Sequence, residues 1–119
     1  MRLYEIEQRI PVSTQYNQDR GNLDWIVLRV ESIAAELGDD LSSLERRVNL
    51  RQLKATQDWL DSEAGGGDPV FPGIPEEYDH LPVVADTGQE LLILDGHHRL
   101  NRALDRGAEI ALVLVFKVK

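Results

Sequence analysis

The last third of the chain alternates between short apolar runs and glycine-containing breaks, and this pattern restricts the possible folds more than any other feature of the sequence. Two apolar runs, residues 82–85 and 90–94, are separated by the turn residues 86–88, which predicts a β-hairpin. Asp95 and Gly96 end the second run, and a helix is predicted to start directly after them.

This helix is predicted over residues 97–106, because leucine and alanine side chains recur there at helical spacing and Gly107 stands where a helix commonly ends. A strongly β-forming run, residues 110–118, follows it. Strand, helix and strand in this order imply a right-handed crossover and at least one parallel pair of strands. We therefore expect an α+β fold with helices packed on a small mixed sheet.

The N-terminal part is expected to form an arm and a helix. Residues 1–18 are polar and mixed, which indicates an extended arm or a short strand. Residues 23–37 place apolar side chains at helical spacing, so we expect an amphipathic helix that Asn22 caps and Gly38 ends.

The signals between this helix and the hairpin are shorter. Residues 42–45 have the Ser-x-x-Glu spacing of a capping box, which predicts a second, short turn of helix through Arg47. Residues 48–57 indicate a short strand that leads into a turn, and residues 58–64 could form one or two helical turns. Residues 65–75 hold four glycines and three prolines and are expected to be a loop, either a lid or an insertion.

The composition is that of one small globular domain, with 119 residues of which 42% are hydrophobic and 29% charged. We expect residues 1–47 to extend a core formed by residues 48–119. The absence of cysteine excludes a disulfide scaffold, a thiol nucleophile and a cysteine-ligated zinc site. No signal peptide or membrane-spanning run is recognisable, so the expected location is the cytoplasm, without membrane contact.

The charge balance bears on nucleic-acid binding. The chain has 13 lysines and arginines against 21 aspartates and glutamates, a net charge of −8. Proteins that hold duplex DNA neutralise its phosphates with a basic footprint. DNA is therefore not an expected partner, although a small local basic patch remains compatible with this charge.

The predicted start of the C-terminal helix is the strongest candidate site. A helix N-terminus presents free N–H groups and about half a positive charge, which suits an anion. Arg99 can hold a phosphate group through two parallel hydrogen bonds. Asp95 could bind Mg²⁺, act as a base or orient a histidine. The candidate phosphate-binding residues are Gly96, His97, His98, Arg99 and Arg102.

The same residues have other interpretations. Asp95 could cap the helix, and exposed arginines on a helix are commonly solvated. Two histidines and an arginine after Asp95–Gly96 favour function, because cations in a first turn oppose the helix dipole unless an anion binds. A metal site from Asp95, His80 and the two histidines is a third interpretation, although neighbours in a helix point about 100° apart and do not easily share one ion.

The stretch ILDGHHRLNRAL resembles the signature of the ParB/sulfiredoxin superfamily, in which a strand, a glycine-containing turn and a helix form a nucleotide phosphate site. The resemblance covers residues 48–118, and residues 48–57 (VNLRQLKATQ) are similar to the family's earlier strand-plus-glutamine segment. It implies a ParB/sulfiredoxin-like mixed sheet, with the N-terminal helix as an extension. It also implies a bound nucleotide, ATP or ADP, with Mg²⁺, and adds Gln57 to the candidate nucleotide-binding residues.

Two branches of this superfamily differ from the chain at readable positions. Sulfiredoxins carry a cysteine where this chain has His97, so the lack of cysteine excludes their chemistry. The arginine-rich motif of ParB partition proteins begins Gly–Glu–Arg–Arg. Gly96 and Arg99 match this motif, whereas His97, His98 and Asn101 depart from it. No DNA-reading helix-turn-helix follows the motif, so we do not expect chromosome partitioning.

The free serine kinases of the superfamily have the most similar motif, Asp–Gly followed by histidine and arginine-type residues. The resemblance implies that Asp95 and His98 serve phosphoryl transfer and that Arg99 holds phosphate. Those kinases have a glutamate in the earlier segment where this chain has Gln57, which cannot act as a base.

Three functions remain as hypotheses. The first is a nucleotide-dependent phosphotransferase or hydrolase that acts on a small-molecule acceptor, with Asp95 or His98 transferring a proton. The second is a non-catalytic, nucleotide-responsive module of the phage or bacterial accessory type, which docks on a protein through the helix at residues 23–37. Gln57 in place of an acid favours the second. The third, a ParB-like nuclease or DNA-binding protein, is disfavoured by the net charge of −8.

Overall fold

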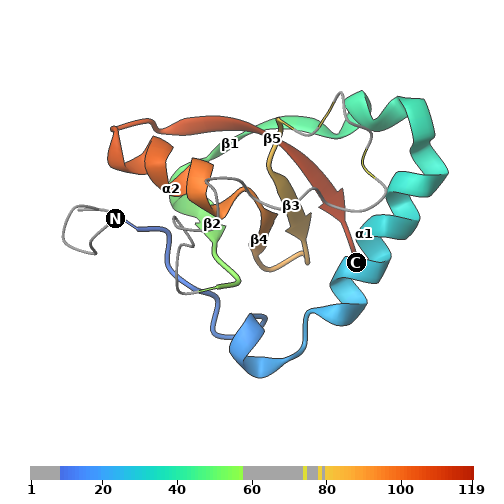
Figure 1. Ribbon diagram of the computed structural model, residues 1–119, viewed down its shortest axis with the longest axis horizontal. Helices are drawn as coiled ribbons and strands as arrows, with labels where there is room; N and C mark the ends of the chain where they lie inside the picture. Colours follow the sequence, from blue (N-terminus) through green and yellow to red (C-terminus); the bar gives the residue numbers. More distant parts are fainter. Residues whose placement is uncertain (1–8, 58–73, 75–77, 79) are drawn as a thin grey trace.

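The computed structural model describes residues 9–57, 74, 78 and 80–119. These residues form an α+β fold in which two α-helices pack on a five-stranded mixed sheet that curls into a half-barrel (Figure 1). The helices are α1 (Asp24–Leu37) and α2 (His97–Asp105). No helix of the described part is long and apolar enough to cross a membrane. The expected α+β fold with a mixed sheet is confirmed.

The sheet combines parallel and antiparallel pairs. Its strands within the described residues are β1 (Glu45–Asn49), β2 (Leu53–Lys54), β3 (Val83–Asp86), β4 (Leu91–Asp95) and β5 (Ile110–Lys117). They lie side by side in the order β1-β5-β3-β4-β2. The pairs β1–β5 and β3–β4 are antiparallel, whereas β3–β5 and β2–β4 are parallel.

The parallel pairing expected from strand, helix and strand is present, but it does not join the two strands that flank α2. β4 is antiparallel to β3 and β5 is parallel to β3, so β4 and β5 run in opposite directions with β3 between them. The parallel partner of β5 is β3, and the connection between these two strands contains both β4 and α2. In a simple crossover, β4 itself would be the parallel neighbour of β5. Here the β3–β4 hairpin places β3 beside β5 instead.

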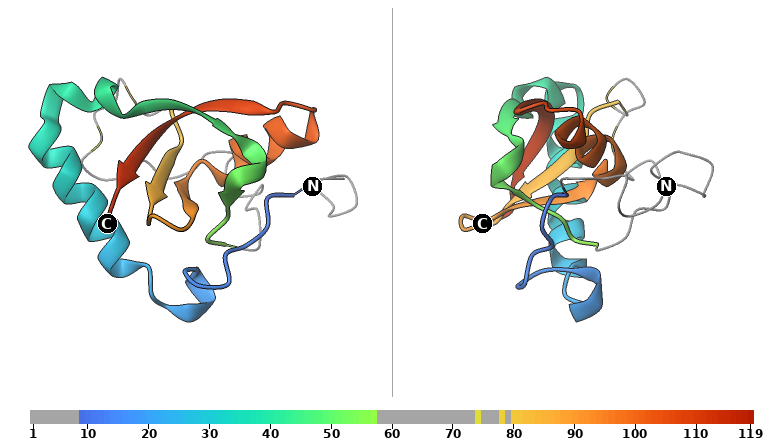
Figure 2. Two further views of the ribbon diagram at one scale, coloured as in Figure 1. Left: turned by 180° about the vertical axis from the view of Figure 1, so that it is seen from behind. Right: turned by 90° about the vertical axis from the view of Figure 1, so that its left-hand side faces the viewer.

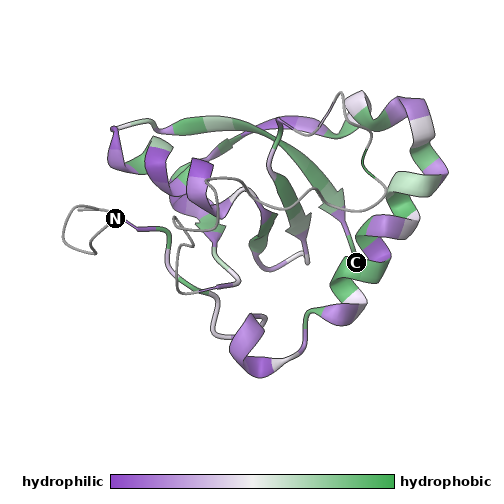
Figure 3. Ribbon diagram, in the orientation of Figure 1, coloured by the Kyte–Doolittle hydropathy of each residue, from purple (hydrophilic) through white to green (hydrophobic). Residues whose placement is uncertain are grey.

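Side chains on the two faces of the sheet pack into two apolar clusters. Successive residues of a strand point to opposite faces, so Leu92 joins the cluster that α1 covers and Ile93 joins the cluster that α2 covers. Ile26 and Phe116 are fully buried in the first cluster, and Leu100 is buried in the second. Figure 2 shows the two helices well apart on the sheet, and Figure 3 shows mainly hydrophobic strands beside a mainly hydrophilic α2.

The helix predicted over residues 23–37 is confirmed by α1, and Gly38 ends it as expected. The prediction that Asn22 caps this helix is wrong, because the N-cap residue is Leu23. The side chain of Asn22 instead accepts a hydrogen bond from the amide of Asn17 at 3.3 Å and donates one to a carbonyl of the preceding segment. Asn22 therefore fixes the loop before the helix.

The turn of helix predicted from residues 42–45 through Arg47 is wrong. Residues Gly38–Leu44 form the 3₁₀ helix η3, and β1 starts at Glu45. β1 pairs with β5 over its whole length, and this long-range pairing outweighs the local capping-box signal. The strand predicted over residues 48–57 is divided, because the 3₁₀ helix η4 (Leu50–Gln52) separates β1 from β2. The helical turns and loop predicted over residues 58–75 lie outside the described residues, apart from Ile74.

The arm ahead of α1 lies along β2, on the side of β2 that faces away from β4. The amide of Ala55 donates to the carbonyl of Pro11 at 2.8 Å, and the amide of Ser13 donates to the carbonyl of Ala55 at 2.9 Å. A short 3₁₀ helix, η2 (Gln18–Arg20), follows before α1. The described part of the predicted arm is thus extended as expected, whereas residues 1–8 lie outside the described residues.

The C-terminal predictions are confirmed within one or two residues. The hairpin is β3–β4, the helix is α2, and the closing strand is β5. Gly107 has a φ of 91°, and its amide donates to the carbonyl of Leu104 at 3.0 Å, as expected for the residue after a helix.

Two glycines of this region allow a matched test of packing at the start of α2. Gly96 and Gly107 both have positive φ, 96° and 91°, but a Cβ at Gly96 would lie 2.7 Å from Cβ of the buried Pro82, whereas a Cβ at Gly107 would meet nothing within 4 Å. We expect Gly107→Ala to lower the free energy of unfolding by about 1 kcal/mol through backbone strain alone. Gly96→Ala should lower it by about 3 kcal/mol, because the clash adds to that strain. Urea denaturation followed by tryptophan fluorescence measures both, and equal losses would contradict the packing argument.

Candidate functional site

The first turn of α2 lies at the edge of the sheet where β2 and β4 end. Because these two strands are parallel, the residues that follow β2 come to the same edge as those that follow β4. Thr56 and Gln57 therefore lie beside Asp95 and Gly96. The structure brings together the two segments on which the sequence resemblance rests.

Gly96 is the N-cap residue of α2 and has φ 96° and ψ 17°. Pro82, which precedes β3, lies where a Cβ of residue 96 would stand and would overlap any side chain at this position. The close approach at Gly96 is thus to Pro82. A glycine at the N-cap also has no side-chain oxygen that could accept hydrogen bonds from the first turn, which leaves that turn without the usual cap.

His97 points into the protein and is only 3% exposed. Its Nε2 accepts a hydrogen bond from the amide of Thr56 at 3.0 Å, so Nε2 carries no proton and the neutral ring is protonated at Nδ1. The hydroxyl of Thr56 donates to the carbonyl of Ile93 at 2.7 Å, which completes a buried network between β2, β4 and α2. Burial lowers the pKa of His97 from 6.5 to about 4, so this side chain is neutral at physiological pH.

His98 and Arg99 follow His97 in the same turn. His98 is half-buried, and its Nε2 lies below the surface without a hydrogen-bond partner among the described residues. The guanidinium of Arg99 is exposed and donates to the carbonyl oxygen of His80. Arg102 is also exposed. It follows Arg99 by three positions, so the two arginines lie on the same side of the helix. The first turn contains no acidic residue, so its polar surface is basic.

Asn101 is an important residue that the sequence did not single out, except as a departure from a motif. Its Oδ1 accepts a hydrogen bond from the amide of Ile10 at 2.9 Å, and its Nδ2 donates to the carbonyl of His97 at 2.8 Å. Asn101 is 2% exposed and thereby ties the arm to the first turn of α2. One signal could have pointed to Asn101. It is an amide side chain that follows His97 by four positions and lies between the buried Leu100 and Leu104.

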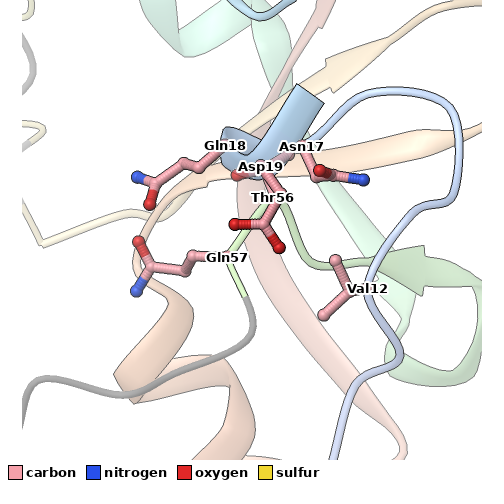
Figure 4. Close-up of a pocket in the computed structure, with 6 residues that line it drawn as sticks. All are labelled: Val12, Asn17, Gln18, Asp19, Thr56 and Gln57. Atoms are coloured by element: carbon pink, nitrogen blue, oxygen red, sulfur yellow. The ribbon is translucent and has the colours of Figure 1, made fainter. Parts of the chain in front are cut away.

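A small polar hollow lies beside this turn, at the end of β2. Its lining includes Gln57, which the resemblance had placed in the nucleotide site, and Thr56, which contacts His97. Its volume is about 10 Å³, enough for one water molecule or one ligand hydroxyl group. Figure 4 shows the carboxamides of Gln18 and Gln57 on the same side of the hollow, with Asp19 nearby.

The metal site weighed from Asp95, His80 and the two histidines is not assembled. Within the described residues, no three histidine, aspartate or glutamate side chains lie close enough together to hold a metal ion. Mg²⁺ is less demanding, since one or two carboxylates suffice when phosphate oxygens and water supply the other ligands. Asp95, directly before Gly96, is the carboxylate at the turn, and it is 9% exposed.

Comparison with known proteins finds no matching family model, no similar curated protein and no similar solved structure. The functional argument therefore depends on the geometry around the first turn of α2.

The neutral, buried His97 predicts a specific dependence of stability on pH. The unfolded chain protonates this histidine near pH 6.5, whereas the folded chain does so only near pH 4, so acidification between these values favours unfolding. The contribution is fully present above pH 6.5 and decreases by about 3 kcal/mol as the pH falls to 4.

His97→Gln keeps an acceptor for the amide of Thr56 but cannot be protonated. Its free energy of unfolding, measured in urea at several pH values, should therefore fall less steeply between pH 6.5 and 4 than that of the wild type. All other titrating groups are common to both proteins. A difference between the two slopes of unfolding free energy against pH is therefore due to position 97. Identical slopes would show that His97 is not held neutral in the folded state.

Proposed function

We propose that the first turn of α2 binds the phosphate group of a nucleotide. One observation carries this proposal: the helix starts at a glycine without a capping side chain, and the buried Nε2 of His98 in the same turn has no partner among the described residues. Buried polar atoms in native proteins normally have a hydrogen-bond partner, so an unpaired one at a helix start indicates a place for a ligand oxygen.

The electrostatics of the turn support an anion. The first N–H groups of a helix have no intrahelical partner, and the macrodipole places a partial positive charge beside them. Arg99 and Arg102 add two full positive charges on one side of α2, in a chain whose net charge is −8. A cation in the first turn, such as Arg99, opposes the helix dipole unless an anion binds beside it, whereas Arg102, in the last turn, is favourable with the dipole.

Each residue of the proposed site has a distinct part. His98 donates a hydrogen bond from Nε2 to a phosphate oxygen, and Arg99 supplies a charged, two-pronged donor. His97 is neutral and buried, so it contributes by holding the turn against Thr56 at the end of β2. Gly96 allows the tight packing on Pro82 that sets the direction of the turn.

The nucleotide and its ion come from the resemblance to the ParB/sulfiredoxin superfamily, which also suggests ATP or ADP with Mg²⁺. The residues present are compatible with such a ligand. Asp95 would hold Mg²⁺ together with phosphate oxygens and water, and the ion would neutralise the charge that accumulates on the phosphates. Gln57, Gln18 and Asp19 line the hollow beside the turn, where a hydroxyl group of the ligand could be bound.

Two outcomes of binding are compatible with this site. Asp95 or His98 could transfer a proton in a phosphotransferase or hydrolase reaction on a small-molecule acceptor. Gln57 favours the second outcome, binding without turnover, because the kinases that the motif resembles have a glutamate in the corresponding segment and an amide cannot act as a base. In that case the bound nucleotide would alter the surface offered to a protein partner.

A thermal-shift panel of ATP, ADP, CTP, GTP and inorganic phosphate, each with and without Mg²⁺, tests the binding site. Ligand at about 100 times its Kd should stabilise the fold by roughly 2.7 kcal/mol, which is a rise in Tm on the order of 10 °C. We expect Arg99→Ala to abolish this rise.

Arg106→Ala is the matched control, because it removes an exposed arginine from the far end of the same helix. It should retain the full shift. A shift that Arg99→Ala leaves unchanged would place the ligand elsewhere, and no shift with any ligand would contradict phosphate binding at α2.

Turnover is tested separately with the nucleotide that gives the largest shift. If the site is catalytic, the wild type forms product and Asp95→Asn lowers kcat by about 100-fold, because general acid–base catalysis commonly contributes that much. The thermal shift with nucleotide reports whether Asp95→Asn still binds. Wild-type protein that binds nucleotide and forms no product over hours would favour the binding module over the enzyme.

A further inference from the structure

The outer edge of β1 has no neighbouring strand among the described residues. β1 borders the sheet and pairs with β5 alone among the described strands (Figure 2). The amide of Leu50 donates to the carbonyl of Glu109 at 2.9 Å, and this bond fixes the alternation of inward and outward groups along the antiparallel pair. Arg47 consequently turns its N–H and C=O groups away from β5, and Asn49 turns its N–H away, whereas the carbonyl of Asn49 belongs to the start of η4.

Exposed apolar side chains lie directly beside this edge. Leu112 stands opposite Arg47 and Ile110 opposite Asn49, and residues opposite each other share a face of the sheet. Leu112 is 43% exposed and Ile110 is 59% exposed. β3 pairs with β5 only from Leu114 onward, so within the described residues this part of β5 has a strand on the β1 side alone. An open strand edge next to exposed apolar side chains is typical of an interaction surface.

The charge of β1 identifies the kind of partner. Arg46 and Arg47 are adjacent and exposed, and their side chains point to opposite faces of the sheet. The guanidinium of Arg46 donates to the carbonyls of Ser43 and Glu45, at 2.9 and 2.8 Å, which holds it beside the strand. The acidic residue of β1, Glu45, is half-buried at its start. The edge is therefore basic, although the chain as a whole has a net charge of −8.

A second copy of the chain does not fit this edge. Antiparallel pairing of two β1 strands would bring the arginines of both copies together, and like charges on paired strands are unfavourable. Two chains of net charge −8 also repel each other at long range. The occupant must instead carry negative charge where it meets β1.

We propose that β1 binds an extended acidic segment of another protein as an additional strand of the sheet. The outward N–H and C=O of Arg47 and the outward N–H of Asn49 pair with the backbone of that segment. Two adjacent acidic residues meet Arg46 and Arg47, one on each face. The proposal is independent of nucleotide binding at α2.

The probe is a blocked peptide of about eight residues in which two adjacent glutamates are flanked by valines and threonines, a length typical of a strand. A control peptide has lysines in place of the glutamates. The full chain, labelled with nitrogen-15, is titrated with each peptide. We expect saturable amide shifts and slower hydrogen exchange at Arg47 and Asn49 with the acidic peptide, and no change with the lysine peptide.

Arg47→Glu should weaken binding of the acidic peptide by about tenfold or more, since it opposes like charges. Arg29→Glu makes the same change of charge on the exposed side of α1 and should bind as the wild type does. Thermal unfolding of both variants shows that the fold is retained.

Three results would overturn the proposal. The acidic peptide could leave the β1 amides unchanged at millimolar concentration, the lysine peptide could bind equally well, or Arg47→Glu could bind as tightly as the wild type. Sedimentation equilibrium supplies the remaining test: a dimer in which the β1 amides become protected without peptide would assign the edge to a second copy and refute an acidic partner.

Discussion

The arrangement of this fold depends on the hydrogen bonds of one buried residue, Thr56. β2 comprises two residues, so its ladder with β4 is too short to hold that edge of the sheet by itself. Thr56 compensates with all of its polar groups. Its amide donates to His97, its hydroxyl donates to the carbonyl of Ile93, and its carbonyl accepts from the amide of Gln18 at 2.9 Å. Because each of these groups is buried, losing any partner would leave an unsatisfied polar atom and cost about 1–3 kcal/mol.

The adjacent histidines of α2 acquire different properties from this arrangement. Successive residues of a helix point about 100° apart, so only one of the two can face the interior. His97 faces Thr56, and its burial lowers its pKa to about 4 and makes it an acceptor of hydrogen bonds. His98 is half-buried, and its Nε2 has no partner among the described residues. A pair of histidines that could pass for a metal site in the sequence thus divides into one side chain with a buried hydrogen bond and one whose buried nitrogen has no described partner.

Sequence signals succeeded where the determining interactions are local. The hairpin, α2 and Gly107 follow from apolar periodicity and turn residues within a few positions of each other. The signal failed at residues 42–47, where a local capping box competes with pairing to β5, about seventy positions away, and the pairing prevails. The roles of Thr56 and Asn101 were equally hidden, because their partners lie 41 and 91 positions away in the chain. The end of β4 at Asp95 and Gly96 was predicted, but the packing of Gly96 on Pro82 was not, because it joins segments that are apart in the chain.

The same contacts separate residues that maintain the site from residues that can recognise a ligand. Asn101 and Thr56 bind the arm and α2 to each other through buried hydrogen bonds, so a change at either position alters the fold and the first turn together. Arg99 and Arg102 lie on the exposed side of the helix, where a substitution removes charge and leaves the buried network intact. His98 stands between these groups, because it is half-buried and one of its ring nitrogens has no partner in the described part of the chain. A loss of binding on changing Arg99 can therefore be attributed to lost recognition, whereas the same loss on changing Thr56 cannot be separated from displacement of α2, because a buried network responds as a unit.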